Sequence, residues 1–242
     1  MPSGRFAIHL AFQLLLSPGD RILMSPLEDD TVFFGALAAG LRPVMAPVST
    51  HDAAHALETD IDGCPIGSFG AVSAFSLSKH FPGRGGVLAF DREISRRDIA
   101  RLRDRLMLAR PIGKRTLGRL RDLGRDREER IAGVLRLRAL DAVAPAAREG
   151  DPLPLLRVPL LIENRDAVTL ELRRRGINVY FVYAPPLDEY SGPEFCEPSA
   201  LPEAARWWAT HILPVDPHDA ERVLDLVGKN QIRLTAAAPP PV

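Results

Sequence analysis

Apolar helices and short apolar strands alternate at close spacing in the N-terminal part of the sequence, and this alternation limits the fold more than any other feature. The predicted elements are a helix at residues 6–16, a strand at 21–24, a helix at 31–39 and a strand at 43–46. Ser17-Pro18-Gly19-Asp20 stops the first helix, and Gly40 closes the second, because glycine takes the left-handed conformation that ends helices. Elements of this length in this order predict a layered α/β domain.

A similar alternation returns in the C-terminal part. The predicted elements are a strand at residues 158–162, a helix at 165–175 capped by Gly176, a strand at 177–183, a helix opening at 201–203, an extended segment at 211–214 and a helix at 219–227. These elements predict a second, smaller α/β domain.

A basic segment separates the two parts. Residues 92–138 contain 16 Lys or Arg against 7 Asp or Glu, and Ser95 with Asp98 resembles a helix capping box. The segment could bind nucleic acid or phosphate, but the lack of interleaved aromatic residues favours a solvated helical face. We therefore expect a large domain at residues 1–91, a helical connector and linker at 92–155, and a small domain at 156–242. The Ala-, Pro- and Gly-rich stretch 142–154 is the expected linker, and the Pro-rich end is expected to be a disordered tail.

Composition excludes several classes of function. The chain has 242 residues, 46% apolar residues and a net charge of +0, so no overall field attracts it to nucleic acid or membranes. Cys64 and Cys196 are too few and too far apart for a disulfide framework or zinc site, which favours the cytoplasm. The longest apolar runs, such as residues 179–184, are too short to span a bilayer.

Several catalytic motifs are absent or incomplete. Residues 111–116 contain a Gly-Lys pair but lack the other residues of a phosphate-binding P-loop, and no G-x-S-x-G nucleophile motif occurs. His51 and His55 stand four residues apart and could share a helical face in a metal site. No further ligands lie near them in the sequence, so this hypothesis is a weak one.

Lys79 stands just after an apolar stretch and before a Pro/Gly-rich turn, where an unpaired ammonium would lose its hydration. It is either a solvated loop residue or a residue placed for its amine. Asp52 follows the predicted strand at 43–46, where an α/β protein places acids that face a ligand. An aspartate that keeps a pyridine nitrogen protonated, with a lysine that forms a Schiff base, is the pairing that pyridoxal 5'-phosphate (PLP) requires.

Four groups of residues extend this pattern along the chain. They are Ser3-Gly4-Arg5-Phe6-Ala7 with Pro18-Gly19-Asp20; His51-Asp52-Ala53-Ala54-His55-Ala56 with Gly67-Ser68-Phe69-Gly70; Phe75-Ser76-Leu77-Ser78-Lys79 with Gly85-Gly86; and Asn164-Arg165-Asp166 with Arg175-Gly176-Ile177, Tyr183-Ala184-Pro185-Pro186-Leu187 and Leu201-Pro202. In order and spacing they resemble the DegT/DnrJ/EryC1/StrS family of PLP-dependent sugar aminotransferases, whose fold is the aspartate-aminotransferase-like fold type I.

The resemblance implies a role for each matching residue. Lys79 corresponds to the lysine that binds PLP and moves protons as a general acid and base, and Asp52 to the acid that pairs with the pyridine nitrogen. His55 stands where the family has glutamine, near the phenolic oxygen of the cofactor. Gly4, Arg5 and Phe6 correspond to the helix N-terminus that binds phosphate, and Ser76 or Ser78 could add a hydroxyl. The implied substrates are a nucleotide-linked keto sugar and an amino-acid donor such as glutamate, and the implied assembly is a homodimer.

The sequence also departs from the family pattern. Ser49-Thr50 joins segments that the family separates by at least one βαβ unit, roughly 30 residues or more. The family's segment before the first motif is missing, Arg5 replaces a threonine, and the aromatic residue that stacks on the cofactor falls near residues 27–30, which are not aromatic. These departures leave an alternative open, a catalytically degenerate homologue that keeps the fold as a structural or interaction protein.

Overall fold

The computed structural model describes residues 4–46, 60–61, 64–65, 72–76, 86–91, 93–105, 123–179 and 184–239. The elements of the N-terminal part are α1 (Gly4–Leu15), β1 (Arg21–Met24), α2 (Asp30–Ala38), β2 (Arg42–Met45), β3 (Asp60–Ile61), β4 (Cys64–Pro65), β5 (Val72–Ser76), β6 (Gly86–Phe90) and α3 (Arg96–Arg105). The four elements predicted up to residue 46 are confirmed. Gly40, which was predicted to close α2, has a φ of 79°.

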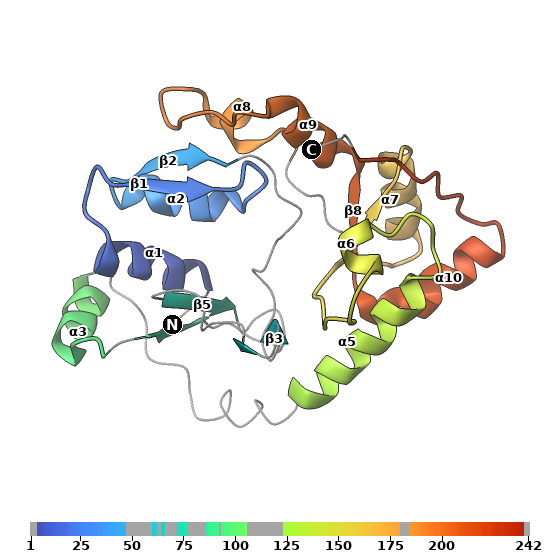
Figure 1. Ribbon diagram of the computed structural model, residues 1–242, viewed down its shortest axis with the longest axis horizontal. Coiled ribbons are helices and arrows are strands. Elements are labelled where there is room, and N and C mark those ends of the chain that lie inside the picture. Colours follow the sequence, from blue (N-terminus) through green and yellow to red (C-terminus); the bar gives the residue numbers. More distant parts are fainter. Residues whose placement is uncertain are drawn as a thin grey trace.

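The described strands of the N-terminal part form separate two-stranded sheets. β1 pairs with β2 in parallel, and β5 pairs with β6 antiparallel. In Figure 1, α1 lies between these two pairs, and it packs on α2 on one side and on β5 and β6 on the other. Parallel strands are normally covered on both faces, yet Leu23 in β1 is 70% exposed. Among the described residues, β1 and β2 form a two-stranded sheet without further strands beside them, and such a small sheet leaves apolar groups exposed.

The chain returns from the C-terminal part to complete the small core around α2. Leu187 in α8 (Leu187–Ser191) and Cys196 are buried against Phe33, which is fully buried. Glu197 continues the β1–β2 sheet, since its backbone bonds to Pro43 and Met45 at 2.9 Å. Burial raises the pKa of the Cys196 thiol. The segment 184–199 therefore belongs, by packing, with the N-terminal part (Figure 1).

The remaining elements form a second core. They are α5 (Leu123–Leu137), α6 (Pro145–Arg148), β7 (Val158–Leu161), α7 (Arg165–Arg174), α9 (Pro202–His211), β8 (Ile212–Val215), the 3-10 helix η3 (Pro217–Asp219) and α10 (Ala220–Gly228). β7 and β8 pair antiparallel, and Leu160 and Leu213 are fully buried in a core that also contains Val134 of α5. The helices and strands predicted for this part are confirmed, except at residues 177–183.

Three predictions for the C-terminal part need correction. Residues 177–179 are not part of a strand, and residues 180–183 lie outside the described residues. Within the expected linker 142–154, Val143 is buried in the core and forms a bridge to Leu160. The expected disordered tail pairs with β7, because Ala236 bridges to Ile162 and the Ala237 amide donates to the Leu161 carbonyl at 3.0 Å. The domain division at residues 91 and 155 remains a prediction.

A group of ionised side chains joins α5 to the turn after β8. Arg130 is 4% exposed and pairs with Asp126 at 2.8 Å and with Asp216 at 3.7 Å. Asp216 also bonds to Arg157 and to the imidazole of His218. Burial by itself would raise the pKa of Asp216, but the hydrogen bonds from His218 and the charge of Arg157 outweigh it and hold this pKa below its ordinary value.

Asp216→Asn is expected to lower the free energy of unfolding at about pH 7 and to make little difference near pH 2. A carboxyl whose folded pKa is depressed adds stability above its unfolded pKa of about 3.9, and that stability is lost as pH falls through the folded pKa. Urea denaturation of both proteins across this pH range measures the difference. Asp225→Asn is the control, because the Asp225–Lys229 pair is exposed and contributes little. A difference for Asp216→Asn that is unchanged at low pH would contradict the expectation.

Candidate functional site

The structure describes only part of the predicted site. Lys79, Asp52, His55 and Ser78 lie outside the described residues, as do His51 and the other residues from Pro47 to Thr59. Gly4, Arg5 and Phe6 form the first turn of α1, as predicted, and the backbone of Ser76 ends β5. The described part of the candidate site therefore consists of α1 and its neighbours.

The N-terminus of α1 has the donor groups that a phosphate requires. The first amides of a helix have no partner within the helix, and the helix dipole makes this end positive. The first turn of α1 contains no acidic residue that would neutralise this end, and Gly4 is buried while Phe6 is 43% exposed. These features fit the phosphate group of PLP or another phosphate-bearing ligand.

Arg5 does not stand free beside this turn. Its guanidinium Nη2 lies 3.5 Å from Oδ2 of Asp29, the residue that precedes α2. The other oxygen of Asp29 accepts the Thr31 amide at 2.9 Å and thereby caps α2. The Arg5 side chain is 64% exposed, and an exposed pair of this kind is weak. A phosphate could therefore compete with Asp29 for the guanidinium. An aspartate just before the predicted helix at residues 31–39 is a typical N-cap, and this signal could have identified Asp29 from the sequence.

His9 fixes the orientation of α1 against α2. Its Nδ1 lies 3.0 Å from the Gly35 carbonyl oxygen, and its Nε2 lies 3.1 Å from Nε2 of Gln13. The carbonyl can only accept, so Nδ1 is the donor, and Nε2 accepts from the Gln13 amide. No sequence motif indicated a role for His9. This contact, one turn beyond Arg5, holds the N-terminal half of α1 to α2.

The strand that leads to the lysine motif packs on the same helix. β5 and β6 run antiparallel with Ser76 opposite Gly86, and both strands contact α1. Figure 1 shows this hairpin directly below α1. Ser76 precedes Lys79 by only three residues. The structure therefore brings the predicted phosphate-binding helix and the strand before Lys79 into one packed unit.

The described residues contain no group of three or more His, Cys, Asp or Glu side chains placed to hold a metal ion. Among the same residues, no helix is long and apolar enough to cross a membrane.

Comparison with solved structures decides the fold. An aminotransferase of the DegT DnrJ EryC1 StrS type from Brucella abortus superimposes with a TM-score of 0.71 and 15% identity, over 96% of this chain and 85% of that one. DesI, solved in the presence of its TDP-sugar product, superimposes with a TM-score of 0.66 and 20% identity, over 93% of this chain and 78% of DesI. The E. coli GDP-4-keto-6-deoxy-D-mannose-3-dehydratase, solved with bound hydrated PLP, superimposes with a TM-score of 0.70 and 12% identity, over 93% of this chain and 85% of the dehydratase. The chain has the fold of these enzymes.

The predicted fold class, a PLP-transferase fold of type I with α/β architecture, is thereby confirmed. The sequence itself matches no protein-family model and none of the curated proteins. Because one of the three neighbours is a dehydratase, the fold alone does not select the reaction. That selection depends on the residues of the site.

Proposed function

We propose that the chain is a PLP-dependent aminotransferase of the DegT/DnrJ/EryC1/StrS family, which transfers an amino group from an amino acid such as glutamate to a nucleotide-linked keto sugar in polysaccharide or secondary-metabolite biosynthesis. The observation that supports this most strongly is the fold, shared with such enzymes over more than nine-tenths of the chain. The motif around Lys79 favours amino transfer, because its amine is the group that attaches to an aldehyde cofactor.

The residues of the chain have distinct parts in this proposal. PLP, when bound, supplies an electron sink at the substrate carbon. The amides of Gly4, Arg5 and Phe6 hold the phosphate. Asp52 keeps the proton on the pyridine nitrogen, and His55 donates a hydrogen bond to the phenolic oxygen. The Nζ atom of Lys79 would attach to the aldehyde of the cofactor and, once released, would take up and give back the proton of the substrate carbon as a general base and acid.

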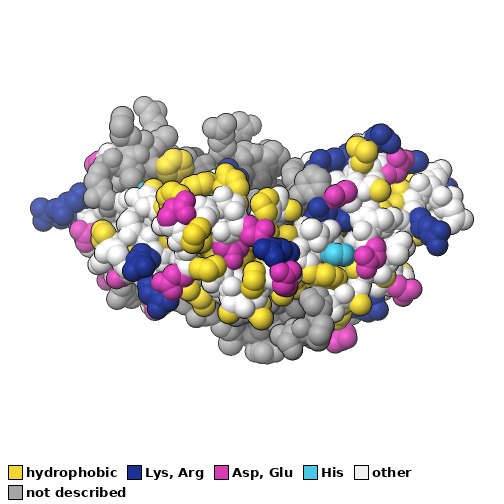
Figure 2. All heavy atoms as spheres, turned by 90° about the horizontal axis from the view of Figure 1, so that it is seen from above, with side chains coloured by type: hydrophobic (Ala, Val, Ile, Leu, Met, Phe, Trp, Pro, Cys, Tyr) yellow, Lys and Arg dark blue, Asp and Glu magenta, His cyan; other side chains and the backbone are white. Residues whose placement is uncertain are grey.

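The proposal includes a homodimer in the cytoplasm. Tyr190 and Phe195 on the segment that covers β2 are 59% and 50% exposed, and Tyr190 contacts the half-exposed ring of Phe34. Figure 2 looks onto this side of the molecule and shows apolar side chains among charged ones. Exposed apolar groups of this kind, with Leu23 of β1, support a second copy as the partner.

One observation favours the alternative, a degenerate homologue without turnover. The β1–β2 and β5–β6 pairs form no common sheet among the described residues. A site built from both pairs would then depend on contacts through α1. The alternative therefore predicts a folded chain without amino transfer.

Addition of PLP to the purified chain is expected to produce a visible absorption band that borohydride bleaches, with the cofactor covalently retained. Glutamate alone is then expected to yield 2-oxoglutarate and convert the cofactor to its amine form, which is the first half of the reaction. Pyridoxal without phosphate serves as the control and should bind more weakly, because it lacks the group held by α1. Covalent retention without 2-oxoglutarate, or no retention at all, would contradict the aminotransferase and favour the degenerate homologue.

A further inference from the structure

The first turns of α1 and α2 lie side by side. Nη2 of Arg5 lies 3.5 Å from Oδ2 of Asp29, the N-cap of α2. Further along both helices, Nδ1 of His9 lies 3.0 Å from the Gly35 carbonyl oxygen. The two contacts follow in the same order along α1 and α2, so the positive ends of both helix dipoles lie on the same side. Asp29 also follows the carboxyl end of β1, an edge where α/β proteins bind ligands.

The two oxygens of the Asp29 carboxylate have different partners. Oδ1 accepts the amide of Thr31 at 2.9 Å and also its hydroxyl, and these bonds cap α2. Oδ2 faces the guanidinium of Arg5. The Asp29 side chain is 26% exposed, whereas that of Arg5 is 64% exposed. The cap therefore keeps the carboxylate in place, while the guanidinium is free to move away from it.

Arg5 belongs to the first turn of the helix that we propose binds the phosphate of PLP. The Cα–Cβ bonds of a helix tilt toward its N-terminus, so the Arg5 side chain begins in the direction of that end. A guanidinium matches the geometry of a phosphate and can hold two of its oxygens at once. The carboxylate of Asp29, by contrast, repels a phosphate. Carboxylate and phosphate therefore compete for one cation.

We propose that Arg5 binds the phosphate with its side chain as well as its amide, and that Asp29 weakens this binding by holding the guanidinium. The inference rests on the proposed function, because it takes the phosphate from PLP. Arg5 is then a binding residue where the family has threonine, and Asp29 is a positioning residue. An exposed ion pair is held only part of the time. If Asp29 holds Arg5 for about two-thirds of the time, the apparent dissociation constant is about three times that of the unrestrained guanidinium.

Equilibrium dialysis with pyridoxine 5'-phosphate at constant ionic strength tests the proposal. This analogue has the phosphate but no aldehyde, so it cannot attach to Lys79. Asp29→Asn removes the charge and keeps the cap, since asparagine caps helices as well as aspartate does, and it is expected to lower the dissociation constant about threefold. Arg5→Gln is expected to raise the dissociation constant about tenfold, the effect of losing one charge-assisted bond. Pyridoxine, which lacks the phosphate, should bind equally to the parent and to both variants.

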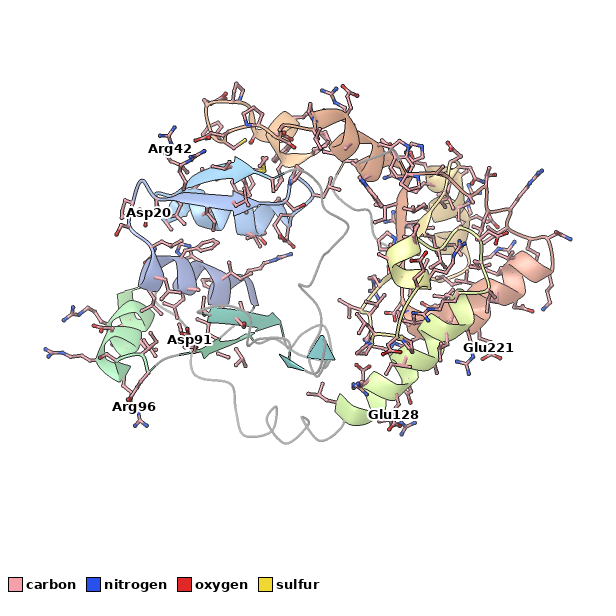
Figure 3. All side chains as sticks on the ribbon, viewed as in Figure 1. Asp20, Arg42, Asp91, Arg96, Glu128 and Glu221 are labelled. Atoms are coloured by element: carbon pink, nitrogen blue, oxygen red, sulfur yellow. The ribbon has the colours of Figure 1, made fainter. Side chains whose placement is uncertain are left out.

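Asp30→Asn and Arg96→Gln are the matched controls. Asp30 is the next residue and has the same charge as Asp29, but the ion pair of Arg5 is with Asp29. Arg96 belongs to α3, and Figure 3 shows its side chain pointing away from α1. Both controls should bind pyridoxine 5'-phosphate as the parent does. Asp29→Ser is a second variant that keeps a capping side chain without the charge, and it should tighten binding as Asp29→Asn does.

Several results would overturn the proposal. They are equal affinity of the parent and Asp29→Asn, an equal gain in Asp29→Asn and Asp30→Asn, an unchanged dissociation constant in Arg5→Gln, and no binding of pyridoxine 5'-phosphate by any variant. The outcome is distinguishable from that of the proposed function. Tighter binding by Asp29→Asn in a chain that forms no 2-oxoglutarate would support the inference and contradict the aminotransferase. Unchanged binding in a chain that forms 2-oxoglutarate would contradict the inference alone.

Discussion

Gly133→Ala is expected to lower the free energy of unfolding by about 3 kcal/mol, at the upper end of the usual cost of overpacking. Gly133 is the buried position where α5 meets η3. A Cβ atom there would lie 2.6 Å from the carbonyl carbon of Pro217 and 2.8 Å from its Cβ, and closer still to its carbonyl oxygen. Backbone atoms cannot rotate away as a flexible side chain can, so the helix and the turn must separate.

Gly124→Ala is the control within the same helix. No atom lies within 4 Å of the Cβ that alanine would add there. Replacing an exposed helical glycine by alanine stabilises by about 0.5–1 kcal/mol, since glycine loses more backbone entropy on folding. Urea denaturation of both variants provides the comparison. Equal stability of the two would mean that α5 and η3 do not meet as described.

The separation of α5 and η3 would have a second consequence. Arg130 of α5 is buried beside Asp216, which precedes η3, and movement of the two elements would break this contact. Arg130 would keep its pair with Asp126 in the same helix. Asp216 would keep its contacts with Arg157 and His218. The contact with Arg130 helps to keep the Asp216 carboxylate ionised, so we expect its loss in Gly133→Ala to weaken the dependence of stability on pH in the acid range.

Local signals in the sequence were sufficient to predict where most helices and strands of the described residues end. Pro18-Gly19 ends the turn after α1, and Gly40 approaches Pro18 so closely that an added Cβ would lie 3.1 Å from the proline Cβ. Gly176 ends α7 with a φ of 71°. Each of these elements ends where a single residue type is required, and such requirements can be predicted from a few neighbouring residues.

Contacts between distant residues could not be predicted in the same way. Glu197 pairs with β2 and Ala236 with the end of β7, each across a long separation in the sequence. The Ala- and Pro-rich composition of residues 236–241 indicated disorder. The exposed edge of a strand can nevertheless pair with any segment whose residues have backbone amides to donate, and Ala237 has one. Nothing near Gly133 in the sequence indicates that Pro217 lies against it.

For the candidate site, too, motifs could be recognised from the sequence, whereas contacts between distant residues could not. The resemblance to the family indicates which lysine, acid and helix N-terminus form the site, and of these the structure describes only the helix N-terminus at Gly4 to Phe6. The sequence did not predict that Asp29 holds Arg5, nor that His9 bonds to Gly35, because both contacts depend on how α1 lies against α2. Both residues lie beside the end of α1 that we propose binds phosphate.

Lys79→Arg is expected to abolish covalent attachment of PLP and to slow amino transfer by about 100-fold or more. The guanidinium stays protonated at working pH and is too poor a nucleophile to bond to the aldehyde. The proposed phosphate contacts at α1 do not involve this side chain, so the variant should still bind PLP reversibly. Mass spectrometry after borohydride treatment measures the attachment, and equilibrium dialysis measures the reversible binding.

Asp52→Asn should separate the two properties that Lys79→Arg removes together. Attachment of PLP to Lys79 should remain, whereas 2-oxoglutarate formation from glutamate should slow sharply, since an amide cannot hold the proton on the pyridine nitrogen as a carboxylate does. Lys229→Arg is the control, because Lys229 is exposed and paired with Asp225, and it should change neither measurement. A borohydride-fixed adduct in Lys79→Arg would place the attachment on another amine. Unchanged amino transfer in Asp52→Asn would show that this acid does not face the cofactor.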